Sequence, residues 1–121
     1  APSDACVRGV HADVTALQLR DLLQQRSAQQ SAFALIDVRE PFEVDICAIQ
    51  GSTLVPQGHV PSSDVISSLN PSETVIVMCR SGVRSAAVCD YLRARGFSDV
   101  RNLAGGILGW IDHVDPSLTR Y

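Results

Sequence analysis

One of the four cysteines stands where its side chain could do chemistry. Cys79 ends an apolar run and opens the stretch Cys79-Arg-Ser-Gly-Val-Arg-Ser85. A helix is expected to follow, and its first turn favours negative charge through unpaired N–H groups and the helix dipole. Gly82 lets consecutive amides point inward, and Arg80 and Arg84 add fixed positive charge. We therefore expect a Cys79 thiolate, with a pKa below that of a free cysteine, in a shallow anion-binding cup.

The other cysteines have simpler interpretations. Cys47 and Cys89 fall in short helical stretches and are expected to fill the core, whereas Cys6 is expected to be an exposed thiol near the start of the chain. The sequence contains no C-x-x-C motif and no His at finger-like spacing from the cysteines, so no zinc site is expected. A disulfide framework is not expected, because the core is large enough without one. We expect a cytoplasmic domain with reduced thiols and with no metal or cofactor.

Alternating elements must position the Cys79 loop. Thr15 and Gln18 form a capping box that opens the first helix. Apolar, β-branched runs predict strands at Ala34–Val38, Thr53–Val55, Thr74–Met78 and Val100–Leu103, with residues 56–61 as a loop. Helical patterns cover Ala16–Arg26, Pro41–Ile46, Val65–Leu69 and Arg84–Arg95, and a last helix holds Ile107, Trp110 and Ile111. This alternation predicts an α/β fold with a mostly parallel sheet and helices on both faces.

Size and charge set further limits. The 121 residues, 45% of them hydrophobic, suit a single domain over residues 10–121, preceded by a flexible lead-in over residues 1–9. The formal net charge of −3 gives no global basic field, so no direct nucleic-acid partner is expected. No apolar stretch approaches the ~20 residues that cross a bilayer, so no membrane partner is expected.

Four motifs occur in the order and spacing of a rhodanese domain. They are Ala34-Leu-Ile-Asp-Val-Arg-Glu-Pro41, Cys79-Arg-Ser-Gly-Val-Arg-Ser85, Gly96-Phe97 and Asn102-Leu-Ala-Gly-Gly-Ile-Leu-Gly-Trp110. The resemblance implies a parallel five-stranded sheet flanked by helices, and sulfurtransferase activity of the thiosulfate:cyanide type. It also implies that Cys79 carries the transferred sulfur as a persulfide, in a cradle formed by Arg80, Ser81, Gly82, Val83, Arg84 and Ser85.

A narrower resemblance involves Glu43-Val-Asp-Ile-Cys47 and the ending Val114-Asp-Pro-Ser-Leu118 with Tyr121. These segments resemble the C-terminal rhodanese domain of the two-domain adenylyltransferase–sulfurtransferases, which comprise molybdopterin synthase sulfurylases and ubiquitin-like-modifier-activating enzymes. The resemblance implies an excised domain, covalently linked in the full-length chain to an adenylating domain. Its acceptor would be the adenylated C-terminus of a ubiquitin-like sulfur carrier protein, for molybdopterin synthesis, tRNA thiolation or both. A cysteine desulfurase would supply the sulfur.

The roles of three further groups are open or secondary. Arg39 either shapes the site, as the family resemblance implies, or forms a structural pair with Glu43 one helical turn later. Asp37 is expected to hold the Cys79 loop, because an acid after an apolar run needs polar partners. Gly105-Gly106 is expected to mark tight packing near the site rather than a nucleotide loop.

Three other functions are alternatives to sulfur transfer to a carrier protein. A stand-alone thiosulfate sulfurtransferase is the nearest alternative. A Cys-dependent phosphatase would need a loop one residue longer than the four residues between Cys79 and Arg84. A non-catalytic binding module would have no reason to retain a reactive thiol. Some sulfurylases have an acidic residue at the end of the loop, so we hypothesise that Arg84 attracts small anionic donors such as thiosulfate.

Overall fold

The computed structural model describes residues 13–27 and 33–121, so the lead-in expected over residues 1–9, with Cys6, lies outside the described residues. Five strands form one sheet with every pairing parallel, in the order β1-β5-β4-β2-β3. Their bounds are β1 (Asp13–Val14), β2 (Ala34–Asp37), β3 (Thr53–Leu54), β4 (Thr74–Met78) and β5 (Asp99–Leu103). The expected α/β fold with a parallel five-stranded sheet is confirmed.

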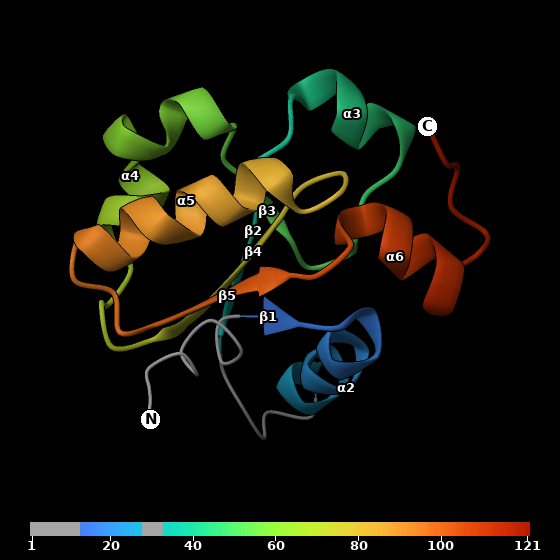
Figure 1. Ribbon diagram of the computed structural model, residues 1–121, viewed down its shortest axis with the longest axis horizontal. Coiled ribbons are helices and arrows are strands. Elements are labelled where there is room, and N and C mark those ends of the chain that lie inside the picture. Colours follow the sequence, from blue (N-terminus) through green and yellow to red (C-terminus); the bar gives the residue numbers. More distant parts are fainter. Residues whose placement is uncertain (1–12, 28–32) are drawn as a thin grey trace.

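Helices cover both faces of this sheet (Figure 1). They are α2 (Ala16–Ser27), α3 (Pro41–Ile46), α4 (Asp64–Ser67), α5 (Val83–Ala94), α6 (Gly106–His113) and the 3-10 helix η1 (Gln57–Ser62). The capping box that opens α2 is confirmed, since the Thr15 amide donates to Gln18 Oε1 at 2.9 Å and the Gln18 amide donates to Thr15 Oγ1 at 3.1 Å.

Two elements differ from the sequence expectation. β1 was not expected, because two residues are too short to show a period; it forms by pairing Asp13 with Asn102 and Val14 with Leu103 of β5. η1 replaces the loop expected over residues 56–61, where the His59 amide donates to the Pro56 carbonyl at 2.8 Å. Neither element has the periodic apolar pattern from which helices and strands are predicted.

The central strand β4 separates two cores. Ile76 and Met78 pack with α2 and α6 on one face, whereas Val75 and Val77 pack with α5, α4 and η1 on the other. This alternation follows from the period of two along a strand. All four side chains are fully buried, which explains why β4 is continuously apolar and why its end is a fixed point for Cys79. Among the described residues, no helix has the length and apolar character needed to cross a membrane.

Candidate active site

The Cys79 loop leaves β4 at the carboxyl edge of the sheet and leads directly into α5. In α/β sheets of this type, sites form at that edge. Gly82 caps the N-terminus of α5 with φ of 105°, a left-handed conformation that side chains disfavour. This turn directs the Gly82 amide back toward the sulfur of Cys79, at 3.1 Å.

The thiol of Cys79 lies inside a ring of hydrogen-bond donors. The Ser85 amide lies 3.4 Å from Sγ and the Ser85 hydroxyl 3.3 Å from it, and Cys79 as a whole is only 1% exposed. Burial raises the pKa of the Cys79 thiol, but hydrogen bonds from the Ser85 hydroxyl and from the amides of Ser85, Gly82 and Ser81 outweigh burial and leave this pKa below its usual value. The expected lowering of the pKa is confirmed.

The Ser85 hydroxyl has one proton and two neighbours that compete for it. It donates to Asn102 Oδ1 at 2.5 Å, while Asn102 Nδ2 donates to the Gly82 carbonyl at 3.1 Å. When the thiol is neutral, its S–H can donate to Ser85 Oγ; when the thiol ionises, the hydroxyl must rotate away from Asn102 to donate to sulfur. The backbone amides keep their direction in both states. They are therefore the permanent donors to the sulfur.

The N-terminus of α6 holds the loop from behind. The amide of Ile107 donates to the Cys79 carbonyl at 2.9 Å, and the amide of Leu108 donates to the Arg80 carbonyl at 3.1 Å. At Gly106, whose φ is 60°, a Cβ atom would overlap the main chain of Arg80. Gly106 thus allows the close approach of α6 and the loop, which confirms the tight packing expected at Gly105-Gly106.

Arg84 is neutralised by a partner from α3. Its Nη1 and Nη2 donate to the two carboxylate oxygens of Glu43 at 2.7 and 2.8 Å. The bonds from Arg84 lower the pKa of Glu43 to about 2, although Glu43 is only 4% exposed. From the sequence, Glu43 is a possible partner of Arg39 and stands within a family motif, but no contact between Glu43 and Arg84 is predicted. Because Glu43 compensates its charge, Arg84 is a weaker attractor of anionic donors than we hypothesised.

Asp37 and Arg39 form a buried ion pair next to the loop. Asp37 lies opposite Met78 in the register of β2 and β4. Arg39 Nη2 donates to Asp37 Oδ2 at 2.7 Å, and Arg39 is fully buried. Arg39 also donates to the main-chain oxygens of Glu43 and Cys47, at 3.3 and 2.8 Å.

The role expected for Asp37 therefore needs correction. Its side-chain hydrogen bonds among the described residues all go to Arg39 and not to the Cys79 loop. The reason is proximity, because the Arg39 guanidinium folds back onto the carboxylate two residues earlier. Arg39 forms a structural ion pair, as one of the two alternatives expected, but its partner is Asp37 rather than Glu43. With Glu43, Arg39 forms a hydrogen bond only to the main-chain oxygen. The Asp37–Arg39 pair secures α3, which in turn presents Glu43 to Arg84.

The comparisons with known proteins agree with this geometry. The family model described as "Rhodanese-like domain" matches residues 15–113. The chain belongs to this family. MoeZ of Mycobacterium tuberculosis, a probable adenylyltransferase/sulfurtransferase, is 35% identical over 118 residues, which make up 98% of this chain and 29% of MoeZ. The chain thus spans less than a third of this relative.

Other relatives match this rhodanese-like domain along most of their own length. A sulfurtransferase of Allochromatium vinosum is 35% identical over 94 residues, covering 78% of this chain and 86% of that protein. The crystal structure of a rhodanese-like domain protein from Staphylococcus aureus has a TM-score of 0.71 at 30% identity, covering 90% of this chain and 97% of that chain. The fold therefore corresponds to that of the Staphylococcus aureus rhodanese-like domain protein over nearly all of the solved chain.

Apart from Arg84, which is paired with Glu43, the residues of the rhodanese cradle divide into two groups. Ser81, Gly82 and Ser85 direct amides at the sulfur. Arg80 and Val83 point outward instead: Val83 is 75% exposed, and Arg80 Nε donates to the main-chain oxygen of Tyr121 at 2.7 Å. The lowered pKa of Cys79 thus comes chiefly from amide and hydroxyl donors, whereas the sequence analysis had also assigned a part to the two guanidinium groups.

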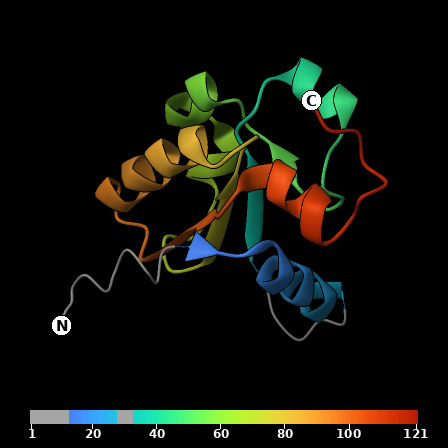
Figure 2. The same cartoon turned by 45° about the vertical axis from the view of Figure 1, so that its right-hand side comes forward.

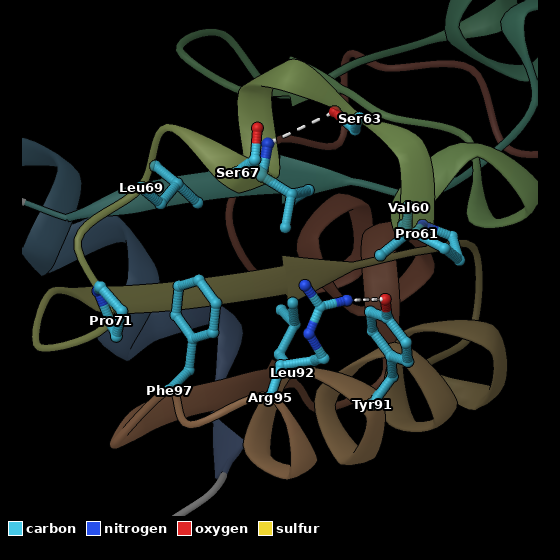
Figure 3. A pocket seen from close by; sticks show the side chains of 11 residues that line it. Val60, Pro61, Ser63, Ser67, Leu69, Pro71, Tyr91, Leu92, Arg95 and Phe97 are labelled. Carbon is cyan, nitrogen blue, oxygen red and sulfur yellow. Dashed lines mark hydrogen bonds between the residues drawn. The ribbon is translucent and has the colours of Figure 1, made fainter.

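Three residues of the site were not predicted as site residues: Glu43, Asn102 and Tyr121. Asn102 stands inside a motif of the family resemblance, and Glu43 and Tyr121 stand inside the narrower one, but no local pattern signals their contacts. The hollow in Figure 3 is a separate feature of about 200 Å³ between η1, α4 and the end of α5. Its lining includes Val60, Tyr91 and Arg95 but no residue of the Cys79 loop.

Proposed function

We propose that this domain takes a sulfane sulfur atom onto Cys79, carries it as a persulfide and passes it to a nucleophilic or activated acceptor. The domain is a sulfurtransferase of the rhodanese type, since it belongs to the rhodanese-like family and its relatives include proteins named as sulfurtransferases. The observation that carries the persulfide proposal is the convergence of the Gly82 and Ser85 amides on Cys79 Sγ.

Thiosulfate illustrates the first half of the reaction. The Cys79 thiolate attacks the outer sulfur of thiosulfate, the S–S bond of the donor breaks, and sulfite leaves with the electron pair. The new terminal sulfur is anionic near neutral pH, as the thiolate was. Fixed amides that stabilise one anion without reorganising can stabilise the other. No general base is needed once the thiolate is formed.

For the second half, the acceptor that we favour is the adenylated C-terminus of a ubiquitin-like sulfur carrier protein. The terminal persulfide sulfur attacks the acyl carbonyl, and the C–O bond to the adenylate breaks as AMP leaves. One thiol then displaces the carrier, as a thiocarboxylate, from the resulting acyl disulfide. A second thiol frees Cys79 as its thiolate, and the two thiols leave joined as a disulfide. The similarity to MoeZ, named as an adenylyltransferase/sulfurtransferase, supports this acceptor. A linked adenylating domain, a cysteine desulfurase as donor, and products in molybdopterin synthesis or tRNA thiolation belong to the same proposal.

Intact mass spectrometry tests the persulfide. Incubation with thiosulfate should add the mass of one sulfur atom to the wild type and to Cys89→Ser, and none to Cys79→Ser. Subsequent addition of an adenylated carrier protein, followed by a thiol reductant, should remove that sulfur and exchange one oxygen of the carrier for sulfur. Addition of sulfur to the Cys79→Ser variant would contradict the assignment of Cys79.

A stand-alone thiosulfate sulfurtransferase is the second candidate. It is favoured by the relative from Allochromatium vinosum, named as a sulfurtransferase, of which this chain covers 86%. Loaded protein that discharges to cyanide but never to an adenylated carrier would support it. A phosphatase is disfavoured, because the Glu43 carboxylate occupies the Arg84 fork that would have to clamp a phosphate.

A further inference from the structure

The segment after α6 returns to the active site. Figures 1 and 2 show it running from the end of α6 to α3, where the last residue lies. Val114 and Leu118 pack against the core shared by α2 and α6, and Arg120 forms an ion pair with Asp112. These contacts of Val114, Leu118 and Arg120 position the segment without involving the Cys79 loop.

The main-chain oxygen and the ring of Tyr121 contact the guanidinium group of Arg80. Arg80 Nε donates to the Tyr121 main-chain oxygen at 2.7 Å, and Nη2 donates to the same oxygen. The guanidinium carbon also lies 5.1 Å from the centre of the Tyr121 ring, which is a cation–π arrangement. These are the N–H groups that would otherwise bind an oxygen of an anion.

Arg80 differs from the other two arginines around the site in its charge balance. Arg84 is paired with Glu43, and Arg39 is paired with Asp37. No side-chain carboxylate of residues 13–27 or 33–121 lies within ion-pair distance of Arg80. Among the described residues, Arg80 is therefore the arginine beside Cys79 without a side-chain carboxylate partner, and the main-chain oxygen of Tyr121 covers its guanidinium group.

The Tyr121 hydroxyl ties the same residue to the paired arginines. It donates to Glu43 Oε1 at 2.9 Å and accepts from Arg39 Nη1 at 2.9 Å. These bonds hold Tyr121 in place without touching Arg80. Weakening them should loosen the cover on Arg80 while leaving its oxygen and ring present.

We propose that Tyr121 is a displaceable latch that sets the affinity of the site for anions. An anionic sulfur donor exchanges with the Tyr121 main-chain oxygen on Arg80, so Tyr121 competes with the donor for the Arg80 guanidinium group. The identity of that anion as a sulfur donor rests on the proposed function, whereas the competition itself does not. Tyr121 is a specificity-determining residue in this arrangement, and Arg80 rather than Arg84 is the residue that it controls.

Binding of inorganic sulfate tests the latch without any sulfur transfer. We would follow the Arg80 Nε–H signal by NMR during sulfate titration of the full chain, of Tyr121→Phe and of a variant lacking residues 119–121. We expect sulfate to bind roughly three- to tenfold more tightly to the shortened variant, the effect of removing one competing hydrogen-bonded contact. Tyr121→Phe should lie between the two.

Two variants establish that the gain acts through Arg80. Arg80→Gln in the shortened background should abolish the tighter binding. Arg95→Gln is the control, since Arg95 also lies over a tyrosine ring, that of Tyr91, and donates to the hydroxyl of that tyrosine, away from the loop (Figure 3). It should leave sulfate binding unchanged.

Equal sulfate affinities of the full chain and the shortened variant would overturn the latch, as would a gain that survives Arg80→Gln. If the shortened variant fails to fold, Tyr121→Phe alone decides, because it retains every main-chain contact. In kinetic assays, the shortened variant should show a lower KM for thiosulfate without a higher kcat. Failure of the wild type to gain sulfur would refute the proposed function, and the sulfate titration would still judge the latch.

Discussion

Cys79 and Cys89 are equally buried, yet their thiols are shifted in opposite directions. Each residue is 1% exposed, and both belong to the core cluster under α5. Burial raises the pKa of Cys89 to about 12. The pKa of Cys79 is lowered although burial acts on it in the same sense. Burial alone therefore makes a thiol inert, and a second influence makes one of the two reactive.

That influence is the position of each residue relative to α5. Cys79 precedes the helix, where the amides of Gly82 and Ser85 have no carbonyl partner one turn earlier and can bond to sulfur. Cys89 stands within α5, where the amides are used by the helix itself. A displacement of ten residues along one chain thus separates a core-filling thiol from a candidate nucleophile.

The largest test of this comparison is titration of the two thiols. Thiolate absorbance should show an ionisation step below the usual cysteine pKa in the wild type and in Cys89→Ser, and this step should vanish in Cys79→Ser. The pKa of Cys79 should lie below its usual value and that of Cys89 at about 12. The comparison fails if the step survives Cys79→Ser.

Moving the donors without altering either thiol should have the next largest effect. Gly106→Ala forces the main chain at Arg80 to shift, because the new Cβ overlaps it. We expect the rate of persulfide formation at Cys79 to fall about a hundredfold, since a displacement of the order of 1 Å spoils the alignment of donors and sulfur. Time-resolved mass spectrometry measures this rate.

Gly58→Ala is the matched control for that substitution, because a Cβ at Gly58 meets no atom within 4 Å. It should load sulfur at the wild-type rate. A folded Gly106→Ala protein that loads within twofold of the wild type would mean that the position of the loop does not govern the reactivity of Cys79.

The opposite shifts should also appear in stability at alkaline pH. Because the pKa of Cys89 is raised in the folded state, its contribution to the free energy of unfolding is complete below the pKa that Cys89 has in the unfolded chain. This contribution is lost as the pH rises toward 12. The lowered pKa of Cys79 acts in the opposite sense. Its contribution to the free energy of unfolding is present above the pKa that Cys79 has in the unfolded chain, and it is lost as the pH falls through the pKa of the folded state.

Urea unfolding at a series of pH values separates the two. Between about pH 8.5 and pH 10, the free energy of unfolding of the wild type should fall by about 2 kcal/mol because of Cys89, and Cys89→Ala should not show this fall. Cys79→Ser should instead lack a stabilising contribution over the same range. Parallel pH profiles for the wild type and Cys89→Ala would show that Cys89 ionises as readily in the folded state as in the unfolded chain.

The smallest expected effects concern the shared proton of Ser85. Ser85→Ala should raise the pKa of Cys79 and slow sulfur loading about fivefold at neutral pH, because one hydrogen bond to the thiolate is lost. Asn102→Ala should lower the pKa of Cys79, because it frees the Ser85 hydroxyl from its competing acceptor. Ser81→Ala, whose exposed side chain makes no bond to sulfur, is the control. Shifts of the same sign in the first two variants would refute the competition.

Much of the fold and the centre of the site could be predicted from the sequence. The continuous apolar run Thr74–Met78, the glycine-containing loop and the helix pattern after it are local, and they predict a strand, a turn and a helix start in that order. The capping box at Thr15 and Gln18 is local as well. β1 could not be predicted, because a two-residue strand exists only through its pairing with β5.

By itself, the sequence determined that Cys79 would end a buried strand and face the first amides of a helix, because these features lie within seven consecutive residues. The tertiary structure alone decided which charges remain near it. Glu43 reaches Arg84 across 41 residues, and Tyr121 reaches Arg80 across 41 and Glu43 across 78. Contacts at such separations depend on how helices and the returning tail pack on the sheet, and no local spacing encodes that packing.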